Sequence, residues 1–152
     1  MSDKLFKAAA ARYIAIADAL EQGADVHTPD VRYSVHDFSV DTGRIRFKAK
    51  RATSRGLKTD RIAVEIRRPS ATDRSYSNTD IDIFAVVEPI SRRVAYLHMS
   101  EIQYARQQTL FLTRDHSRLG MAGDYTPLYF DDLTDINRAV RVAKEYKAQA
   151  AV

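Results

Sequence analysis

The sequence contains no cysteine, which excludes disulfides, thiolate catalysis and cysteine-based zinc sites. Its four histidines follow no zinc-binding spacing, and no His-Glu-X-X-His motif occurs. The chain also lacks a phosphate-binding Gly-X-X-X-X-Gly-Lys loop and the glycines of a nucleophile elbow around a serine. No motif therefore supports a nucleotide-hydrolysing enzyme or a serine hydrolase.

Long hydrophobic runs are absent as well. The apolar segment 5–20 is interrupted by Lys7, Arg12 and Asp18, so it is neither a signal peptide nor a membrane span. We expect a soluble protein without a membrane partner, and the lack of cysteine fits a cytoplasmic, intracellular location. A chain of 152 residues is most simply one domain, residues 1–152, which buries roughly 70% of the surface that its unfolded form exposes.

What the chain does carry is an uneven distribution of charge. The formal net charge is +4, but the segment 44–74 holds eleven of the 24 Lys and Arg residues and only three of the 20 Asp and Glu residues. That segment has a charge of +8, whereas the rest of the chain, with 13 basic and 17 acidic residues, has −4. A basic segment on an otherwise acidic protein favours a surface that binds a polyanion. Exposed Arg and Lys that keep strand edges from pairing would also explain it.

Two segments have the periodicity of amphipathic helices. The first is predicted to begin at Ser2 or Asp3 and to end near Gly23, and the second to begin at Asp131 or Asp132. The expected buried stripe of the first helix consists of Leu5, Phe6, Ala9, Tyr13, Ile16, Ala17 and Leu20. That of the second consists of Leu133, Ile136, Val140, Ala143 and Tyr146.

Between these helices, apolar patterns predict strands at 24–29, 32–40, 44–50, 60–68, 81–87, 93–99 and 109–113. The DTG sequence at 41–43 is expected to form a hairpin turn. The run 81–87 is apolar enough for a central strand covered on both faces. A short helix at 100–106 and a long loop at 114–128 complete an α/β arrangement with a mixed sheet.

The segment 37–52, DFSVDTGRIRFKAKRA, contains the residues with the clearest chemical interpretation. Period two places Arg44, Arg46, Lys48 and Lys50 on one face of the returning strand. Hydrolysis of a phosphodiester commonly uses a divalent cation, and Mg²⁺ is usually held by one or two carboxylates. Asp37 on one strand would supply a metal ligand, and Lys50 on the next would orient the attacking water.

At this point the sequence resembles a known family. The first helix, the hairpin with Asp37 and Lys50, and the segment YSNTDIDIFAVVEPISRRVAYLHMSEI at 76–102 resemble the PD-(D/E)XK nuclease superfamily. Within it they resemble the small intron-encoded homing endonucleases, in which Gln replaces the usual acid before X-Lys. The resemblance runs from about residue 5 to residue 146. It implies a restriction-endonuclease-like fold, an α/β mixed sheet flanked by helices, and Mg²⁺-dependent cleavage of double-stranded DNA by a homo-oligomer.

Two departures from that family's pattern weaken the implied metal site. Lys48 stands where the resemblance implies Glu, Asp or Gln, and an ammonium group cannot ligate a metal. The glutamate that such nucleases carry on the first helix is also absent, since the segment 7–20, KAAAARYIAIADAL, offers only Asp18, late in the helix. Glu65, on the strand 60–68, is a candidate replacement ligand if the strands 44–50 and 60–68 pair antiparallel. The alternative is that Glu65 pairs with a neighbouring Lys or Arg across the sheet.

Other basic residues are candidates for contacts to DNA bases or phosphates. They are Arg44, Arg46, Arg51, Arg55, Lys58, Arg67, Arg68 and Arg74. Asp80 and Asp82 are a second carboxylate pair, for which capping of a turn is the more common use. Three hypotheses follow: a metal-dependent endonuclease, a DNA-binding protein whose Lys48 converts a metal pocket into a phosphate pocket, and a structural protein with a basic face.

Overall fold

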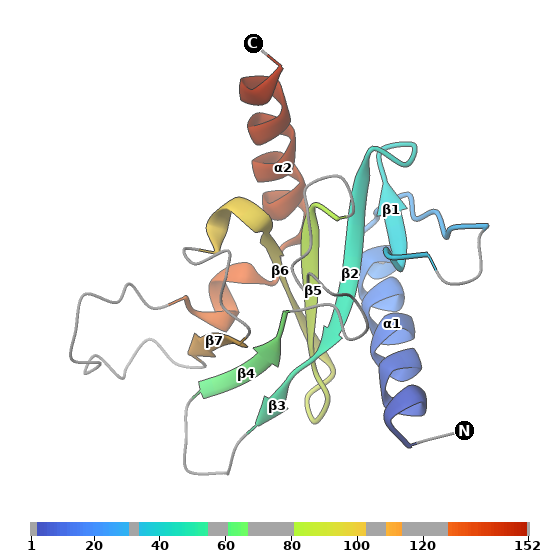
Figure 1. Ribbon diagram of the computed structural model, residues 1–152, viewed down its shortest axis with the longest axis vertical. Helices are drawn as coiled ribbons and strands as arrows, with labels where there is room; N and C mark the ends of the chain where they lie inside the picture. Colours follow the sequence, from blue (N-terminus) through green and yellow to red (C-terminus); the bar gives the residue numbers. More distant parts are fainter. Residues whose placement is uncertain are drawn as a thin grey trace, which may run out of the picture.

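The computed structural model describes residues 3–30, 34–54, 61–66, 81–102, 109–113 and 128–151 (Figure 1). Its elements, in chain order, are α1 (Asp3–Glu21), β1 (Phe38–Val40), β2 (Ile45–Arg51), β3 (Thr53–Ser54), β4 (Arg61–Glu65), β5 (Ile83–Glu88), β6 (Arg93–His98), the 3-10 helix η1 (Met99–Glu101), β7 (Thr109–Thr113), the 3-10 helix η2 (Phe130–Leu133) and α2 (Ile136–Ala150). In the described part of the chain, none of the helices has both the length and the hydrophobicity that a membrane crossing requires.

The strands form two sheets. The larger has the order β1-β2-β5-β6, with β2 parallel to β5 and the other neighbours antiparallel. The smaller is antiparallel and has the order β3-β4-β7. Only Ala52 separates β2 from β3, so the chain passes from one sheet to the other at that residue. The predicted α/β class, with a mixed sheet flanked by helices, is confirmed.

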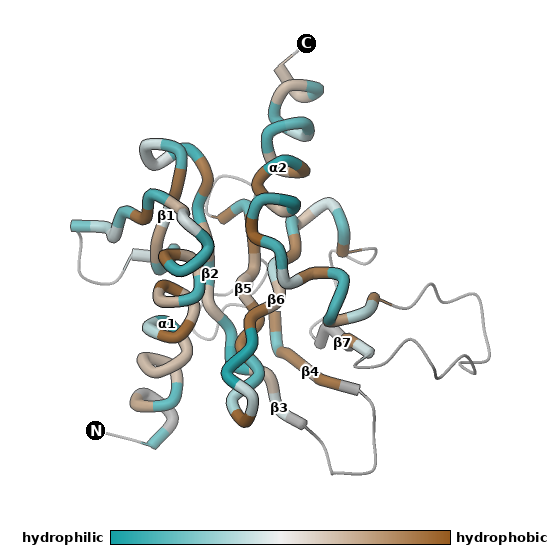
Figure 2. Tube along the Cα trace, turned by 180° about the vertical axis from the view of Figure 1, so that it is seen from behind, coloured by the Kyte–Doolittle hydropathy of each residue, from teal (hydrophilic) through white to brown (hydrophobic). Residues whose placement is uncertain are grey.

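β5 lies inside the larger sheet, and its six residues are all buried, as the apolar run predicts. Its odd-numbered residues, Ile83, Ala85 and Val87, pack with α1 and α2 on one face. Its even-numbered Phe84 and Val86 pack with the smaller sheet and η2 on the other. Seen from behind, much of the hydrophobic part of the chain follows β4, β5 and β6 (Figure 2). The sheet therefore separates two apolar layers, one under the long helices and one under the smaller sheet.

The buried stripe predicted for the first helix is largely wrong, although Ile16 is partly buried against the core. α1 packs through Ala11, Ala15 and Ala19, which are almost fully buried. Phe6, Tyr13 and Leu20, which were expected in the core, are exposed. Hydrophobic periodicity favours the face with the largest apolar side chains, whereas here the close approach of the helix to the sheet selects alanines.

Several predicted element bounds are also corrected. The expected strand at 24–29 is reduced to a single bridge between His27 and Ser39, and only Phe38–Val40 of 32–40 is a strand in the described residues. The short helix ends at Glu101 instead of residue 106, because Ile102, the residue that follows it, has an extended backbone. The last helix begins at Ile136, where the Asp135 side chain accepts a hydrogen bond from the backbone N–H of Asn137 at 2.9 Å. Asp131 and Asp132 lie in η2 instead, one turn earlier.

The antiparallel pairing considered for the segments 44–50 and 60–68 does not occur along β2. β2 pairs in parallel with β5, and only its continuation β3 pairs with β4, Thr53 opposite Ala63. Ile62, Val64 and Ile66 are buried as expected, and Glu65 is exposed. The predicted loop 114–128 lies outside the described residues except for Leu128.

Candidate functional site

The hairpin of β1 and β2 places Asp37 beside the middle of β2. Phe38 pairs with Phe47, and the backbone N–H of Asp37 donates to the Phe47 carbonyl at 2.8 Å. The Asp37 carboxylate accepts a hydrogen bond from the backbone N–H of Ala49, also at 2.8 Å. The turn 41–44 that closes the hairpin includes Gly43 with φ of +87°, a conformation that favours glycine. Asp37 is therefore held at both its backbone and its side chain.

β2 presents lysines to the same side as Asp37. Its burial alternates, with Phe47 and Ala49 buried toward α1 and Lys48 and Lys50 half-buried on the opposite side. The Lys48 Nζ lies 3.5 Å from an Asp37 carboxylate oxygen. The side chains of this ion pair are only 24% and 13% exposed, so water screens it weakly. The sequence pattern thus correctly predicts a shared face, and the structure adds a direct contact of Asp37 with Lys48.

Lys50 is the most strongly perturbed member of this group. Burial, and to a smaller extent the neighbouring charge of Lys48, lower the pKa of Lys50 to about 8, against the opposing effects of Asp37 and Glu65. These effects require that Asp37, Lys48 and Glu65 all lie within electrostatic range of the Lys50 ammonium group. At pH 7 roughly one-tenth of such a lysine is neutral and able to accept a proton.

His36 joins the site although its spacing gave no metal pattern. Its Nδ1 lies 3.0 Å from the Ser34 hydroxyl. Burial, followed by the charges of Arg46 and Lys48, lowers the pKa of His36, while Asp37 opposes that change. His36 therefore sits neutral beside the cationic side of β2 at neutral pH. Its position next to Asp37 in the sequence was the signal that could have identified it.

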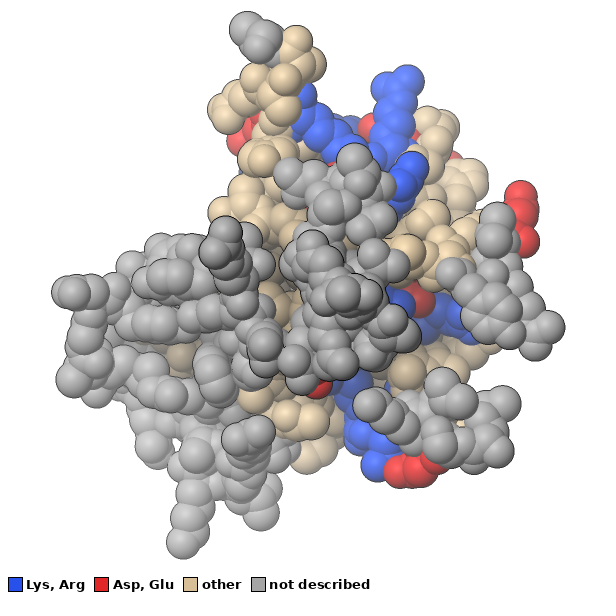
Figure 3. Space-filling model, viewed as in Figure 1, with Lys and Arg blue, Asp and Glu red and all other residues tan. Residues whose placement is uncertain are grey.

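The predicted DNA-contacting residues are distributed over this region and beyond it. Arg44 and Arg46 are exposed, in the turn and at the start of β2 on the side of Lys48. By the same alternation Arg51, also exposed, lies on the opposite side from Lys50. Lys and Arg side chains gather in the region of β2 in the view of Figure 3. Five further candidates lie outside the described residues: Arg55, Lys58, Arg67, Arg68 and Arg74.

The described residues fit a divalent metal poorly at this place. They contain no group of three His, Asp or Glu side chains that could hold a metal ion. The Asp37 oxygen contacted by Lys48 also accepts the Ala49 N–H, so an ammonium group already neutralises the carboxylate that would bind the ion. Asp18 offers no replacement, because it faces β6 and accepts a hydrogen bond from the Tyr96 hydroxyl at 2.7 Å.

Asp82 belongs to a separate polar cluster. It is buried, accepts the backbone N–H of Arg46 at 2.9 Å and lies 3.2 Å from the Lys147 Nζ. It thus links β2 to α2, which supports a structural use of this carboxylate. Asp80 lies outside the described residues.

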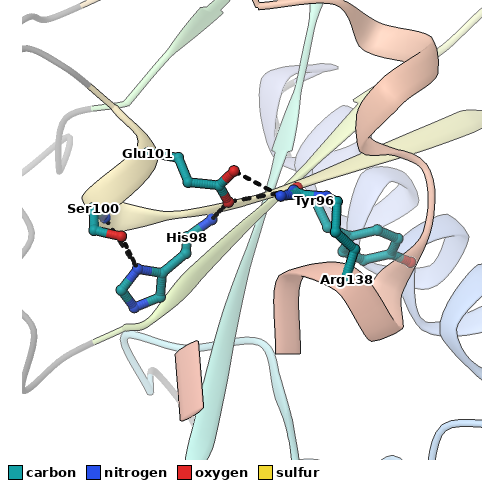
Figure 4. A network of polar contacts seen from close by, with 5 residues as sticks. All are labelled: Tyr96, His98, Ser100, Glu101 and Arg138. Carbon is teal, nitrogen blue, oxygen red and sulfur yellow. Dashed lines mark hydrogen bonds and ion pairs between the residues drawn. The ribbon is translucent and has the colours of Figure 1, made fainter. Parts of the chain in front are cut away.

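A neighbouring network joins β6, η1 and α2 (Figure 4). The Arg138 guanidinium donates to both Glu101 carboxylate oxygens, at 2.6 and 3.3 Å, and to the Tyr96 carbonyl at 2.7 Å. Glu101 in turn accepts the backbone N–H of His98 at 3.0 Å. His98 is buried, and its Nδ1 contacts the Ser100 hydroxyl at 2.7 Å. Burial lowers the pKa of His98, so its neutral form is the one that fits this network.

Replacing Lys50 by methionine is expected to stabilise the fold at pH 7 by about 1 kcal/mol, or about 2–4 °C in Tm. Folded Lys50 loses its proton near pH 8, whereas unfolded lysine keeps its own to about pH 10.5. Between these values the unfolded chain binds more protons, so wild-type stability rises with pH through Lys50. Thermal unfolding at about pH 7 and pH 9.5 should show this rise in the wild type and a smaller one in the variant.

The matched control is Lys144→Met, because Lys144 is exposed on α2. This control should leave both the Tm at pH 7 and its change with pH close to wild type. A Lys50→Met protein that melts below wild type at pH 7 and keeps the full pH dependence would contradict the assignment.

Comparisons with known proteins give a match among solved structures. No protein-family model and no curated protein matches the chain. Among solved structures, it is similar to that of a bacterial homing endonuclease, I-Ssp6803I, with a TM-score of 0.62. The two sequences are 16% identical, and the match covers 99% of each chain. The protein therefore has the fold of that homing endonuclease over nearly its whole length.

Proposed function

We propose that the protein is an endonuclease-like protein that binds double-stranded DNA on the side of β2 that carries Arg46, Lys48 and Lys50. The observation that supports this best is the pair of half-buried lysines side by side on one strand, next to Asp37. Two half-buried cations on the same side of one strand create a positive potential that favours a bound anion. A DNA phosphate would supply that negative charge.

Lys48 and Lys50 have separate roles in this proposal. Asp37 orients the Lys48 ammonium group at 3.5 Å, so that Lys48 binds a phosphate oxygen from a fixed position. Binding of a phosphate next to Lys50 raises the pKa of Lys50 and keeps it charged. The arginines predicted from the sequence, inside and outside the described residues, would extend this contact along the duplex.

Phosphodiester hydrolysis at the same place is the second candidate, and the lowered pKa of Lys50 favours it. A lysine that is partly neutral near pH 7 can accept the proton of an attacking water. The fold match to a homing endonuclease and the resemblance to the PD-(D/E)XK superfamily support this activity as a proposal. The described residues fit a metal poorly, so cleavage with and without added Mg²⁺ tests the metal requirement that the resemblance implies.

Retention of duplex DNA by the purified protein tests the first candidate. Without added metal, we expect binding at about 50 mM salt that weakens about 100-fold by about 200 mM, as four phosphate contacts would produce. Adding Mg²⁺ or Mn²⁺ to the same mixtures tests cleavage. Asp37→Asn keeps an acceptor for the Ala49 N–H and removes the charge, so it should preserve or strengthen retention and abolish any cleavage.

Absence of retention at about 50 mM salt would overturn the DNA-binding proposal and leave a structural role for the basic face. Cleavage that survives Asp37→Asn would remove Asp37 from the proposed chemistry.

We also propose that the protein acts as a homo-oligomer, since duplex DNA sites with two-fold symmetry are commonly bound by symmetric assemblies.

A further inference from the structure

α1 carries an apolar stripe on the side that faces away from the sheet. Of the five large hydrophobic side chains that are exposed in the described residues, three lie on this helix: Phe6 at 59%, Tyr13 at 62% and Leu20 at 55%. Ala10 and Ala17, also exposed, lie between them. Helix α1 lies at the edge of the molecule in both views (Figures 1 and 2). The buried alanines Ala11, Ala15 and Ala19 occupy its other face.

The spacing of this stripe is that of a helix seam. Its residues are Phe6, Ala10, Tyr13, Ala17 and Leu20, separated by four, three, four and three positions. Such a 3.5-residue average keeps side chains in line along two packed helices, with small residues that allow close approach between large ones. We propose that this stripe pairs with the same stripe of a second copy of the chain, with the two α1 helices antiparallel.

The stripe is self-complementary about its centre. Phe6 and Leu20 each lie seven residues from Tyr13, about 10 Å along the helix. A two-fold axis near Tyr13 therefore brings Phe6 of one copy toward Leu20 of the other at both ends of the contact. The Tyr13 ring is supported within its own chain, because the Arg12 guanidinium stacks 4.9 Å from its centroid.

Charge along α1 favours the antiparallel orientation. Its first ten residues contain Asp3, Lys4, Lys7 and Arg12, and its last nine contain Asp18 and Glu21, so the two halves have opposite net charges of +2 and −2. Antiparallel pairing places Lys7 near Glu21 of the other copy, where flanking charges of a helix pair meet. Lys7 is exposed and already contacts Asp3 at 2.8 Å, a surface contact that a second partner can share. Parallel pairing would instead place like charges together.

The proposed contact leaves the candidate DNA surface uncovered. Phe47 and Ala49 of β2 pack on the α1 side of the sheet, and Lys48 and Lys50 lie on the opposite side. Two copies joined through α1 therefore present their cationic surfaces away from the contact. The pairing does not depend on the proposed function, and a variant that separates the copies should still retain DNA.

Sedimentation of the full chain at about 10 to 100 µM tests the pairing. We expect a concentration-dependent species of two copies, and Tyr13→Glu should raise its dissociation constant at least about tenfold by placing two carboxylates at the two-fold axis. The matched control is Ile90→Glu, at the side chain that is 74% exposed in the turn after β5. Ile90→Glu should sediment as wild type. A wild type that stays a single copy at about 100 µM, or a Tyr13→Glu protein that pairs normally, would overturn the proposal.

Cross-linking tests the orientation of the two helices. Because the sequence contains no cysteine, only the introduced cysteines can form a disulfide. A Phe6→Cys protein mixed with a Leu20→Cys protein should form mainly the mixed disulfide on oxidation. Predominant disulfides between identical variants would refute the antiparallel arrangement. If Tyr13→Glu loses pairing but still retains DNA, pairing through α1 and DNA binding are independent. Each proposal can then be contradicted without the other.

Discussion

Replacing Lys48 and Lys50 together by methionine is expected to weaken duplex DNA binding about 100-fold at low salt. Each charge-assisted contact to a phosphate contributes about 1.5 kcal/mol, and two such contacts correspond to about that factor. The salt dependence should change too, because each lost phosphate contact lowers the slope of log affinity against log salt by about 1. A slope reduced by about 2 separates lost phosphate contacts from a general loss of fold.

The matched control for this pair is Lys7→Met with Lys144→Met, which also removes two lysines and two charges. Both residues are exposed on helices that pack on the other face of the sheet. The control should lower affinity less than about threefold, through net charge alone. If the control and the Lys48 and Lys50 double variant weaken binding equally, DNA contacts the protein elsewhere. Loss of affinity without a change in slope would likewise contradict direct phosphate contact.

The hairpin that positions Asp37 was predictable because its information is local. The DTG turn at 41–43, the strict alternation of 45–50 and the apolar run 81–87 each specify an element within a few residues. These signals fixed the face of Lys48 and Lys50 correctly, since a strand has only two faces.

Strand order was not predictable in the same way. β2 pairs with β5, more than 30 residues later in the chain, whereas β4, which lies between them in the sequence, pairs with β3 and β7. Such pairing depends on which apolar faces meet in three dimensions, and periodicity carries no information about it. Glu65 nevertheless lies within electrostatic range of Lys50, because the passage between sheets at Ala52 brings β4 close.

The positive charge of Lys48 could be predicted from the sequence, but its ion pair with Asp37 could not. Lys48 was recognised as a cation at an acidic position, and the contact of its Nζ with Asp37 depends on the hairpin register. The buried face of α1 failed for a different reason. Alanine contributes little to a hydrophobic pattern, yet it allows a helix to approach a sheet closely, so packing selected Ala11, Ala15 and Ala19.

Glu101→Ala is expected to lower the free energy of unfolding by about 2–3 kcal/mol, which corresponds to about 5–10 °C in Tm. The substitution leaves the Arg138 guanidinium, which donates to both Glu101 oxygens, without its compensating carboxylate. It also removes the acceptor of the His98 N–H. Fully buried pairs cost more when broken, but these side chains are 20% and 25% exposed, so water replaces part of the lost interaction. Thermal and urea unfolding measure the change.

A double variant distinguishes the cost of an uncompensated Arg138 charge from the loss of the Glu101 contacts alone. Arg138→Met in the Glu101→Ala background removes the uncompensated guanidinium and retains an apolar side chain against β6, so it should recover at least about 1 kcal/mol. Arg141→Met, at an exposed position of the same helix, is the control and should change stability by less than about 0.5 kcal/mol. If the double variant is less stable than Glu101→Ala, the guanidinium stabilises the fold mainly through the Tyr96 carbonyl at 2.7 Å, and the ion pair is secondary. Because β6 carries Tyr96 and pairs with the central strand β5, either result measures how firmly α2 is attached to the sheet that positions the candidate site.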